Sequence, residues 1–203
     1  MITCPHCEMK FNEENVDDQH EHRAYHDKVL YGVSAGTLAT DEVIWSGVKD
    51  WITVVTPLSP KAQRVRARKV AQLANHETHY HCGIYHEDEK PDEERHMNLF
   101  LYYRKNRIVG LAILEKRGHI WRCNWDEYVS GECRKLDIVT IWSLAFIWVL
   151  MRHRHGGVAR KLFDEAIRFL KTEIENVGFY TEFTPDGEAF IRALHPRQFL
   201  IAK

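Results

Sequence analysis

A long apolar segment, followed by a glycine-containing turn and a helical pattern, constrains the fold of this chain more than any other feature. The apolar segment spans residues 138–151, and the turn reads Arg154-His155-Gly156-Gly157-Val158-Ala159. Apolar residues then recur at helical steps up to residue 171. We therefore expect a buried strand, a turn and a helix. The unpaired N–H groups and the positive dipole end at the start of such a helix form a site for phosphate.

In this context, the pattern Arg-x-x-Gly-x-Ala resembles the pyrophosphate loop of the GNAT acetyltransferases, which hold acetyl-CoA in this way. A plain connection between strand and helix is the alternative that six residues alone leave open. The resemblance implies that the cofactor phosphates contact Arg154, His155, Gly156, Gly157, Val158 and Ala159. Backbone N–H groups at Trp148, Val149 and Leu150 are expected to polarise the thioester carbonyl.

Two cysteines and two histidines near the N-terminus have the spacing of a metal site. Two residues separate Cys4 from Cys7, three separate His22 from His26, and fourteen lie between the pairs. The cysteines fit a tight turn and the histidines one face of a helix, so all four can converge on tetrahedral Zn²⁺. His20 could replace His22, at a less usual spacing. The sequence predicts a C2H2-type zinc finger over residues 1–31, stabilised largely by its metal.

The charge of residues 1–31 indicates what this finger does not do. It carries three basic and seven acidic side chains, a net charge of −4, and the whole chain carries −1. Contacts with the phosphates of DNA require the opposite sign. We expect a structural or protein-docking role for the finger and no broad nucleic-acid surface elsewhere.

Composition sets the class of protein. The chain has 203 residues, 44% of them hydrophobic, which suits one domain with a substantial core and a small appendage. No 18-residue apolar run lacks charge and no signal peptide begins the chain, so we expect an intracellular protein without a membrane span. An odd count of five cysteines argues against a disulfide framework. Cys82, Cys123 and Cys133 are interpreted as plain thiols.

The order of predicted elements over residues 38–203 indicates a GNAT domain. Strands at 43–45 and 51–55 precede a helix that we expect to begin with Ser59 as its N-cap and Pro60 at its first position. A hairpin at 98–103 and 108–114 follows, residues 120–125 continue the meander, and 127–136 form a loop. The strand, turn and helix come next, then a strand at 179–183, a short helix and a last strand at 198–202. The predicted class is α/β (α+β), with a mixed, mostly antiparallel sheet flanked by helices.

Two polar stretches have mainly structural interpretations. The helix after Pro60 carries Lys61, Arg64, Arg66, Arg68 and Lys69. We interpret this row as a solvated basic face, with contact to an acidic partner or to CoA phosphates as the alternative. Histidines surround an acidic segment at 87–95 without matching a metal-site template, so we predict a mobile surface insertion there.

Three further motifs resemble the sister-chromatid cohesion acetyltransferases. The spacing of Cys4, Cys7, His22 and His26 is similar to that of their finger, and residues 147–159 to their acetyl-CoA strand and loop. Thr184-Pro185-Asp186-Gly187-x-x-Phe190 is similar to their C-terminal signature. Members of this family acetylate lysine side chains of a cohesin ATPase subunit. The resemblance therefore implies acetyl-CoA and Zn²⁺ as cofactors and a chromosome-maintenance ATPase as partner.

The resemblance also assigns catalytic candidates. Glu182, before the Thr-Pro-Asp-Gly stretch, and Asp164, on the helix after the loop, match acidic positions of the family. At two positions this sequence departs from the family pattern. Ala145 stands where the family has a serine, which Ser143 could replace, and Leu194 stands where the family has an aromatic residue. These departures and the lack of a long N-terminal extension suggest a stand-alone, prokaryotic relative and leave the substrate open.

We expect direct acetyl transfer from acetyl-CoA to a lysine of a protein substrate. A lysine amine is protonated at neutral pH, so a carboxylate must remove a proton before attack. Glu182 is the first candidate and Asp164 the second, while Asp186 is expected to cap the following helix. Transfer to a small amine or a protein N-terminus, or a degenerate binding module without turnover, are the alternatives. The compartment would be the cytoplasm of a prokaryote or the nucleus of a eukaryote.

Overall fold

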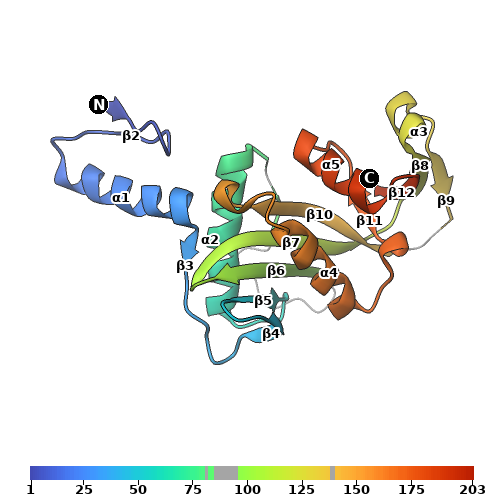
Figure 1. The fold of residues 1–203 in the computed structure, drawn as a ribbon, viewed down its shortest axis with the longest axis horizontal. Coiled ribbons are helices and arrows are strands. Elements are labelled where there is room, and N and C mark those ends of the chain that lie inside the picture. Colours follow the sequence, from blue (N-terminus) through green and yellow to red (C-terminus); the bar gives the residue numbers. More distant parts are fainter. Residues whose placement is uncertain (81, 85–95, 138–139) are drawn as a thin grey trace.

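The N-terminal unit consists of two short strands and one helix. The computed structural model describes residues 1–80, 82–84, 96–137 and 140–203. Strands β1 (Ile2–Thr3) and β2 (Lys10–Phe11) pair antiparallel, and helix α1 (Val16–Tyr31) follows. The Asn15 side chain caps α1 by accepting from the N–H groups of Asp17 and Asp18. In Figure 1 this unit lies at one end of the molecule, and α1 leads from it to the central sheet.

Over the described residues, a ten-stranded mixed sheet forms the centre of the rest of the molecule. Its main path runs β4-β5-β6-β7-β10-β11-β12-β8-β9, and β3 pairs with β7 beside this path. The strands are β3 (Val33–Ser34), β4 (Glu42–Ser46), β5 (Asp50–Val55), β6 (Met97–Arg104), β7 (Arg107–Arg117), β8 (Ile120–Asn124), β9 (Arg134–Leu136), β10 (Ile141–Val149), β11 (Gly178–Tyr180) and β12 (Gln198–Ala202). The predicted hairpin of β6 and β7 is confirmed, and Lys105 and Asn106 form its two-residue turn with positive φ.

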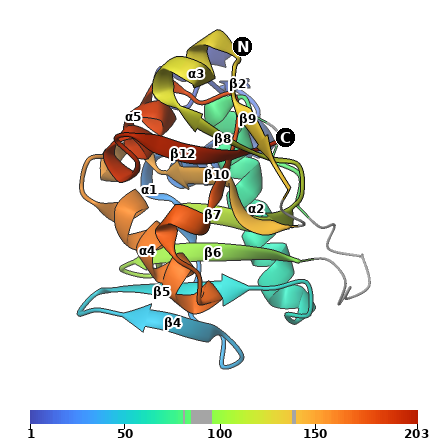
Figure 2. The same cartoon turned by 90° about the vertical axis from the view of Figure 1, so that its right-hand side faces the viewer.

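Helices cover both faces of this sheet. Figure 2 shows α2 (Lys61–Thr78) on one face and α4 (Val158–Leu170) on the other. Helix α5 (Pro185–Leu194) lies beside α4, where Phe163 and Phe190 meet edge to face at 5.8 Å. Helix α3 (Trp125–Ser130) and the 3₁₀ turns η1 (Met151–His153) and η2 (Ile174–Asn176) complete the described elements. The large core includes fully buried Phe100, Leu111 and Phe163.

The sheet opens next to β10, and this opening positions the functional site. Strand β10 pairs with β7 along its whole length, from Ile141 to Val149. On its other side it pairs with the parallel strand β11 at Ser143 and Leu144 alone among the described residues. Because β11 ends at Tyr180, the last part of β10 leaves that side of its backbone free of a neighbouring strand.

Two sequence predictions between residues 120 and 136 are wrong. Strand β8 does not continue the meander from β7, because it pairs with β12 and β9. Residues 127–136 are not a loop throughout, because they contain most of α3 and all of β9. Asn124 caps α3 in a capping box with Glu127. A polar surface helix and an edge strand have no strong apolar period, so the sequence pattern does not reveal them.

Cys123 and Cys133 form a disulfide, which corrects their interpretation as plain thiols. Cys123 lies on β8, and β9 returns antiparallel to β8 directly after Cys133. The short helix between them brings the two Cα atoms to 4.8 Å. A count of cysteines cannot show this proximity. Of the five cysteines, Cys4, Cys7 and Cys82 remain free.

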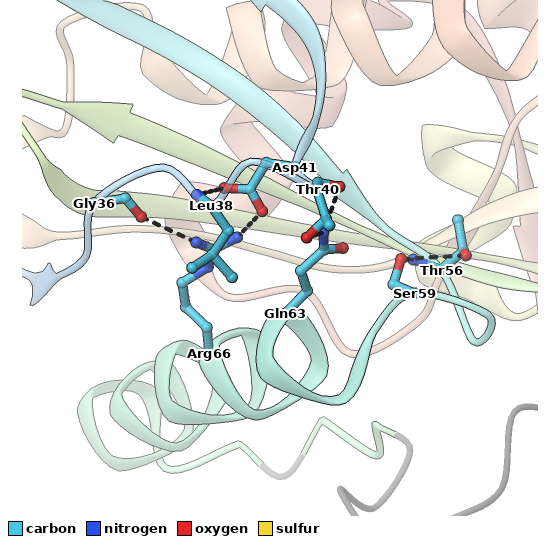
Figure 3. A network of polar contacts seen from close by, with 8 residues as sticks. All are labelled: Gly36, Leu38, Thr40, Asp41, Thr56, Ser59, Gln63 and Arg66. Atoms are coloured by element: carbon cyan, nitrogen blue, oxygen red, sulfur yellow. Dashed lines mark hydrogen bonds and ion pairs between the residues drawn. The ribbon is translucent and has the colours of Figure 1, made fainter.

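The start of α2 also differs from the prediction. The helix begins at Lys61 with Pro60 as its N-cap, and no side chain caps it. The Ser59 hydroxyl instead accepts a hydrogen bond from the N–H of Thr56 at 2.9 Å (Figure 3). The Ser59 side chain therefore stabilises the turn before α2 and does not cap the helix as we expected.

Part of the predicted basic face of α2 is buried. Arg66 is 8% exposed; it forms an ion pair with Asp41 and donates to the carbonyl of Gly36 at 3.1 Å (Figure 3). Gln63 on the same side donates to the carbonyl of Thr40 at 2.6 Å. These bonds hold the segment that leads into β4 against α2. The acidic segment at 87–95 lies outside the described residues.

Candidate functional site

A cleft of about 640 Å³ lies where β10 and β11 separate. It is lined from α2, the end of β10, the turn before α4 and the start of α5. The lining residues are Glu77, Thr78, Ile147, Trp148, Val149, His153, Arg154, His155, Gly157, Val158, Ala159, Arg160, Thr184, Pro185, Asp186, Gly187, Ala189 and Phe190. Of the nine predicted cofactor-binding residues, Leu150 and Gly156 are absent from this lining. The tertiary structure thus brings the loop and the Thr-Pro-Asp-Gly stretch to one space.

The turn before α4 has the backbone geometry of an anion site. Gly157 is the N-cap with a φ of 77°, in the left-handed region that glycine adopts without strain. The helix makes its first hydrogen bond from the N–H of Lys161 to the carbonyl of Gly157. The N–H groups of Val158, Ala159 and Arg160 therefore have no carbonyl partner within the helix. They can donate to phosphate oxygens, assisted by the helix dipole.

A glycine in β7 lets this helix start close to the sheet. A Cβ on Gly110 would lie 3.3 Å from the Val158 side chain and 3.2 Å from that of Tyr102. These distances are tighter than ordinary contacts between side chains, so a larger residue would push the start of α4 outwards. The position of the turn therefore depends on a residue some 50 positions earlier in the chain.

Of the three backbone N–H groups at the end of β10 that we expected to contact the thioester, strand pairing leaves one available to a ligand. The N–H of Leu150 donates to the carbonyl of Val109 at 2.9 Å, so it is not available to a ligand. Because hydrogen bonding alternates along an antiparallel pair, the N–H of Trp148 also points towards β7. The N–H of Val149 points the other way, into the open side of β10. This corrects the expectation that all three contribute.

Arg154 folds back over the cleft. Its Nε donates to the carbonyl of Val149 at 2.9 Å, and its Nη2 donates to Oε1 of Glu77 at 3.0 Å. Its Nη1 lies 3.6 Å from a carboxylate oxygen of Asp186. Arg154 thus connects α2, β10 and α5, which lie around the cleft.

The two predicted general bases lie away from the lining. Asp164 is on α4 and accepts two hydrogen bonds of 2.9 Å from Arg160. Glu182 is exposed, with a φ of 73°, in the bend after β11 and two residues before Thr184. It therefore stands in a turn and not in the predicted strand at 179–183.

Two acids that sequence reasoning left out or interpreted otherwise line the cleft. Glu77, near the end of α2, was not a candidate, because nothing local distinguishes it from a surface acid. Asp186 does not cap α5: the Thr184 hydroxyl accepts from the N–H of Gly187 at 3.1 Å and fills that role. Only the fold brings Glu77 within hydrogen-bond distance of Trp148 and Arg154, 71 and 77 positions away.

His153, in the turn before Arg154, is held by a charged network. Arg104 donates to Nδ1 of His153 at 3.2 Å and also donates to Asp50 at 2.9 Å. Burial, together with the charges of Arg104 and Arg152, lowers the pKa of His153. Because arginine only donates, Nδ1 must be the acceptor, and the neutral ring then carries its proton on Nε2. His153 therefore enters the cleft wall as a neutral donor.

The predicted metal ligands converge. One ligand atom from each of Cys4, Cys7, His22 and His26 lies within 4.8 Å of every other, and Cys4 Sγ is 3.3 Å from Nδ1 of His26. Tetrahedral Zn²⁺ separates its sulfur and nitrogen ligands by roughly 3.4–3.8 Å. Nε2 of His22 is buried and has no hydrogen-bond partner among the described residues. A buried ring nitrogen without a hydrogen-bond partner, on a residue of this cluster, fits a metal ligand.

The chemistry of the cysteines agrees with this geometry. A hydrogen bond from the backbone of His6 lowers the pKa of Cys4 to about 5, so this thiol ionises readily. Burial raises the pKa of Cys7, which a bound cation would reverse. Phe11 stacks on the His22 ring at 3.9 Å and orients it. The four residues thus suit a soft, tetrahedral cation such as Zn²⁺.

Comparison with known proteins identifies the family. A model of the acetyltransferase (GNAT) family matches residues 67–195, which include the whole cleft lining. The chain belongs to this family. Mouse N-acetyltransferase ESCO2 is 25% identical over 92% of the chain, and Candida glabrata N-acetyltransferase ECO1 is 23% identical over 82%. The resemblance to the cohesion acetyltransferases is confirmed by these relatives. The chain spans 32% of the length of the mouse protein and 72% of that of the yeast protein.

Solved structures support the fold. The xEco2 acetyltransferase domain bound to a K105-CoA conjugate superimposes with a TM-score of 0.62 at 20% identity, over 80% of this chain and 97% of that one. The same domain in a second structure gives a TM-score of 0.61 at 19% identity, over 82% and 98%. The predicted GNAT fold is therefore confirmed. Among the described residues, no helix combines the length and apolar character that a membrane span requires.

Proposed function

We propose that this protein is an acetyl-CoA-dependent N-acetyltransferase that acetylates lysine side chains of a protein substrate by direct transfer. The observation that carries the proposal is the cleft between β10 and β11, bounded on one side by the Gly157 turn. Acetyl-CoA, when bound, supplies the acetyl group as a thioester. A small amine or a protein N-terminus as acceptor is the second candidate, since the fold family as such does not select lysine.

The residues around the cleft fit acetyl-CoA. The N–H groups of Val158, Ala159 and Arg160 and the neutral ring of His153 supply donors for the phosphates. Ile147 and Val149 supply apolar and backbone contacts at the open side of β10. The N–H of Val149 is the donor that we assign to the carbonyl on which negative charge develops.

A carboxylate has to accept the proton of the acceptor ammonium before the amine can attack. We retain Glu182 as the first candidate, because its bend leads directly into Thr184 at the cleft wall and its side chain is exposed. Asp164 is the weaker candidate, since Arg160 occupies both of its carboxylate oxygens. A water molecule between base and amine would span the remaining gap.

We further propose that residues 1–31 form a zinc finger and residues 38–203 the acetyltransferase domain. Cys4, Cys7, His22 and His26 would hold Zn²⁺ and fix the turn of β1 and β2 against α1. The acidic charge of this unit favours a structural or protein-docking role over DNA binding. The protein substrate that we propose, from the resemblance to the cohesion acetyltransferases, is a chromosome-maintenance ATPase.

The test is release of free thiol from acetyl-CoA in the presence of lysine peptides. Wild type should turn over, Gly157→Glu should lose both turnover and acetyl-CoA binding, and Glu182→Ala should lose turnover while it still binds acetyl-CoA. The Gly157 change places a carboxylate at the phosphate site. Wild type that binds no acetyl-CoA would contradict the proposal, and an unimpaired Glu182 variant would move the base elsewhere.

A further inference from the structure

The cleft has one end lined by α2 and another lined by the start of α4, and the two ends differ in charge and in hydrogen-bonding groups. Glu77 and Thr78 come from α2, whereas Gly157 and Val158 come from the opposite face of the sheet (Figure 2). The cleft therefore extends through the gap between β10 and β11, from one face to the other. The α4 end offers N–H donors to an anion, and the α2 end presents a carboxylate.

The carboxylate of Glu77 is oriented by two donors. Its Oε2 accepts from the indole N–H of Trp148 at 2.7 Å, and its Oε1 accepts from Arg154 at 3.0 Å. Its side chain is 16% exposed. A carboxylate has about four acceptor positions. These two bonds therefore fix Glu77 and leave room for a further donor.

Two further aromatic rings extend the face of β10 that carries Trp148, outside the cleft lining. Tyr80 stacks on Phe146 with ring centres 5.7 Å apart and planes at 9°. Phe146 and Trp148 are two positions apart on β10, so their side chains lie on the same face of the strand. Tyr80 is 38% exposed, so the stack borders on solvent. Glu77 and three aromatic rings thus share the α2 face of β10.

The charges around Arg154 favour a cation here. Arg154 contacts both Glu77 and Asp186, so one positive charge faces two negative ones. A phosphate near Glu77 would be repelled by its charge, whereas an ammonium group would be attracted. The anionic cofactor and a cationic acceptor are therefore directed to opposite ends of the cleft.

We propose that the α2 end of the cleft is the acceptor site, in which Glu77 binds the lysine ammonium and Trp148 contacts its aliphatic stem, while the Tyr80–Phe146 stack contacts the substrate beside the cleft. This inference rests on the proposed function and specifies how lysine is selected. Lysine stems pack on apolar surface while the charged end stays with a polar partner, and aromatic faces attract the cation. Glu77 recognises the charged form, and a separate base takes the proton.

The decisive experiment compares two acceptors of equal length in wild type and Glu77→Gln. One is Nα-acetyl-lysine N-methylamide, and the other is its aminooxy analogue, whose amine is uncharged at neutral pH. The variant keeps the size of the side chain and removes its charge. We expect kcat/KM to fall at least about tenfold for the lysine compound and less than about twofold for the analogue. Acetyl-CoA affinity, measured by calorimetry, should stay unchanged.

Matched variants complete the design. Glu188→Gln removes a carboxylate of α5 that pairs with Arg192 and does not line the cleft, so it should leave both acceptors unaffected. Tyr80→Ala should raise KM for the lysine compound, and Tyr80→Phe, which keeps the ring, should restore it. A circular dichroism spectrum of each variant confirms that it is folded.

Other outcomes overturn the inference. Equal losses for both acceptors in Glu77→Gln, together with weaker acetyl-CoA binding, would mean that Glu77 only supports Arg154. An unchanged lysine kcat/KM would contradict the acceptor site and leave the acetyltransferase proposal standing. Wild type without turnover on any amine would contradict both.

Discussion

The N-terminal unit and the sheet domain of this protein are held together in different ways. Three buried residues, Cys4, Cys7 and Phe11, form the core of the N-terminal unit, and two of them are proposed metal ligands. Helix α1 has no buried residue along its sixteen positions. The sheet domain, in contrast, encloses a large apolar core between α2, α4 and the strands. One region therefore depends on a cation and the other on apolar burial.

This difference follows from size. A short unit cannot bury enough apolar surface to offset the entropy of ordering its chain, so it requires a cross-link or a metal. A domain of more than 150 residues can stabilise itself by burial alone. The two regions meet where Asp27 forms an ion pair with Arg107 and where the Tyr25 hydroxyl lies 2.6 Å from Nδ1 of His76. Val29 also packs against both cores, and the Arg152 guanidinium lies 4.9 Å from the Tyr31 ring centre. Together these contacts determine how far a change in one region affects the other.

Removal of the proposed zinc should give the largest difference between the two regions. Structural zinc sites contribute on the order of 10–16 kcal/mol of apparent binding free energy. We expect Cys7→Ser, or a strong chelator, to unfold residues 1–31 while the sheet domain stays folded. Hydrogen exchange by mass spectrometry would resolve the two regions. Loss of protection across both regions at once would show that they fold as one unit.

Truncation of a core side chain should destabilise the sheet domain and leave the N-terminal unit unaffected. Phe163 is fully buried and contacts Phe179 and Phe190. Phe163→Ala is expected to lower the free energy of unfolding of the sheet domain by about 3–5 kcal/mol, through lost burial and the cavity left behind. Urea titration followed by tryptophan fluorescence would measure this. Zinc affinity of the N-terminal unit, titrated separately, should remain that of wild type.

The turn before α4 should show a moderate effect on both stability and binding. The Cβ added by Gly157→Ala would meet no atom within 4 Å, so the substitution causes no clash. The alanine would still have to adopt the left-handed φ of 77°, which strains its backbone. This strain costs roughly 1–2 kcal/mol. We expect a slightly lower melting temperature and weaker acetyl-CoA binding. Gly131→Ala, at a left-handed helix end outside the cleft, is the control: it should lower stability alone.

Acid should weaken the charged network behind the turn. The pKa of His153 is lowered from its ordinary 6.5, mainly by burial, so below that pH the unfolded chain binds protons more readily. The contribution of neutral His153 to the free energy of unfolding is therefore fully present above about pH 6.5. It is lost as the pH falls below that value towards the lower folded-state pKa. His153→Asn should reduce the loss of unfolding free energy between pH 7 and pH 5. His119→Asn, on an exposed turn outside this network, is the matched control substitution.

Asp50 should extend this behaviour to lower pH. Burial acts to raise its pKa, but hydrogen bonds from Arg104 and Tyr102 outweigh burial and lower it from 3.8. Its contribution is present above that value and is lost as the pH falls through the lower folded-state pKa. Urea midpoints measured down to pH 3 should therefore show a second loss in wild type. Asp50→Asn should remove it.

The contact between the two regions should give the smallest effect. Arg107 donates to Asp27 at 2.5 Å, and both side chains are partly exposed. Pairs of this kind contribute up to about 1 kcal/mol. A double-mutant cycle with Asp27→Ala and Arg107→Ala, read by the melting temperature of the zinc-loaded protein, would give the coupling. A coupling energy of several kcal/mol would contradict the view that the regions are stabilised independently.

Local patterns predicted much of this molecule. The four proposed metal ligands follow from spacing alone, because a turn and one helix face bring them together within a short stretch. The hairpin of β6 and β7 and the strand, turn and helix around Gly157 follow from period and from turn residues. Each of these features depends on neighbours in the sequence. Conformational preference is sufficient to set them.

The acceptor end of the cleft could not be predicted in this way. Glu77 meets Trp148 and Arg154 only because α2 packs beneath β10, and no local property marks it. The N–H of Val149 faces the open side of β10, while that of Leu150 donates to Val109, because the register of β7 against β10 sets which N–H groups point towards β7. Likewise, β8 crosses to β12, and the disulfide follows from the return of β9.

The sequence by itself thus determined most of the elements, the proposed metal site and the proposed phosphate turn, since these depend on residues close together in the chain. The tertiary structure alone decided which face of β10 receives a carboxylate, which backbone donors are free and which cysteines pair. Those properties depend on strand register and on packing between distant segments. Many chain paths are compatible with the same local pattern, and burial of the common core selects one of them.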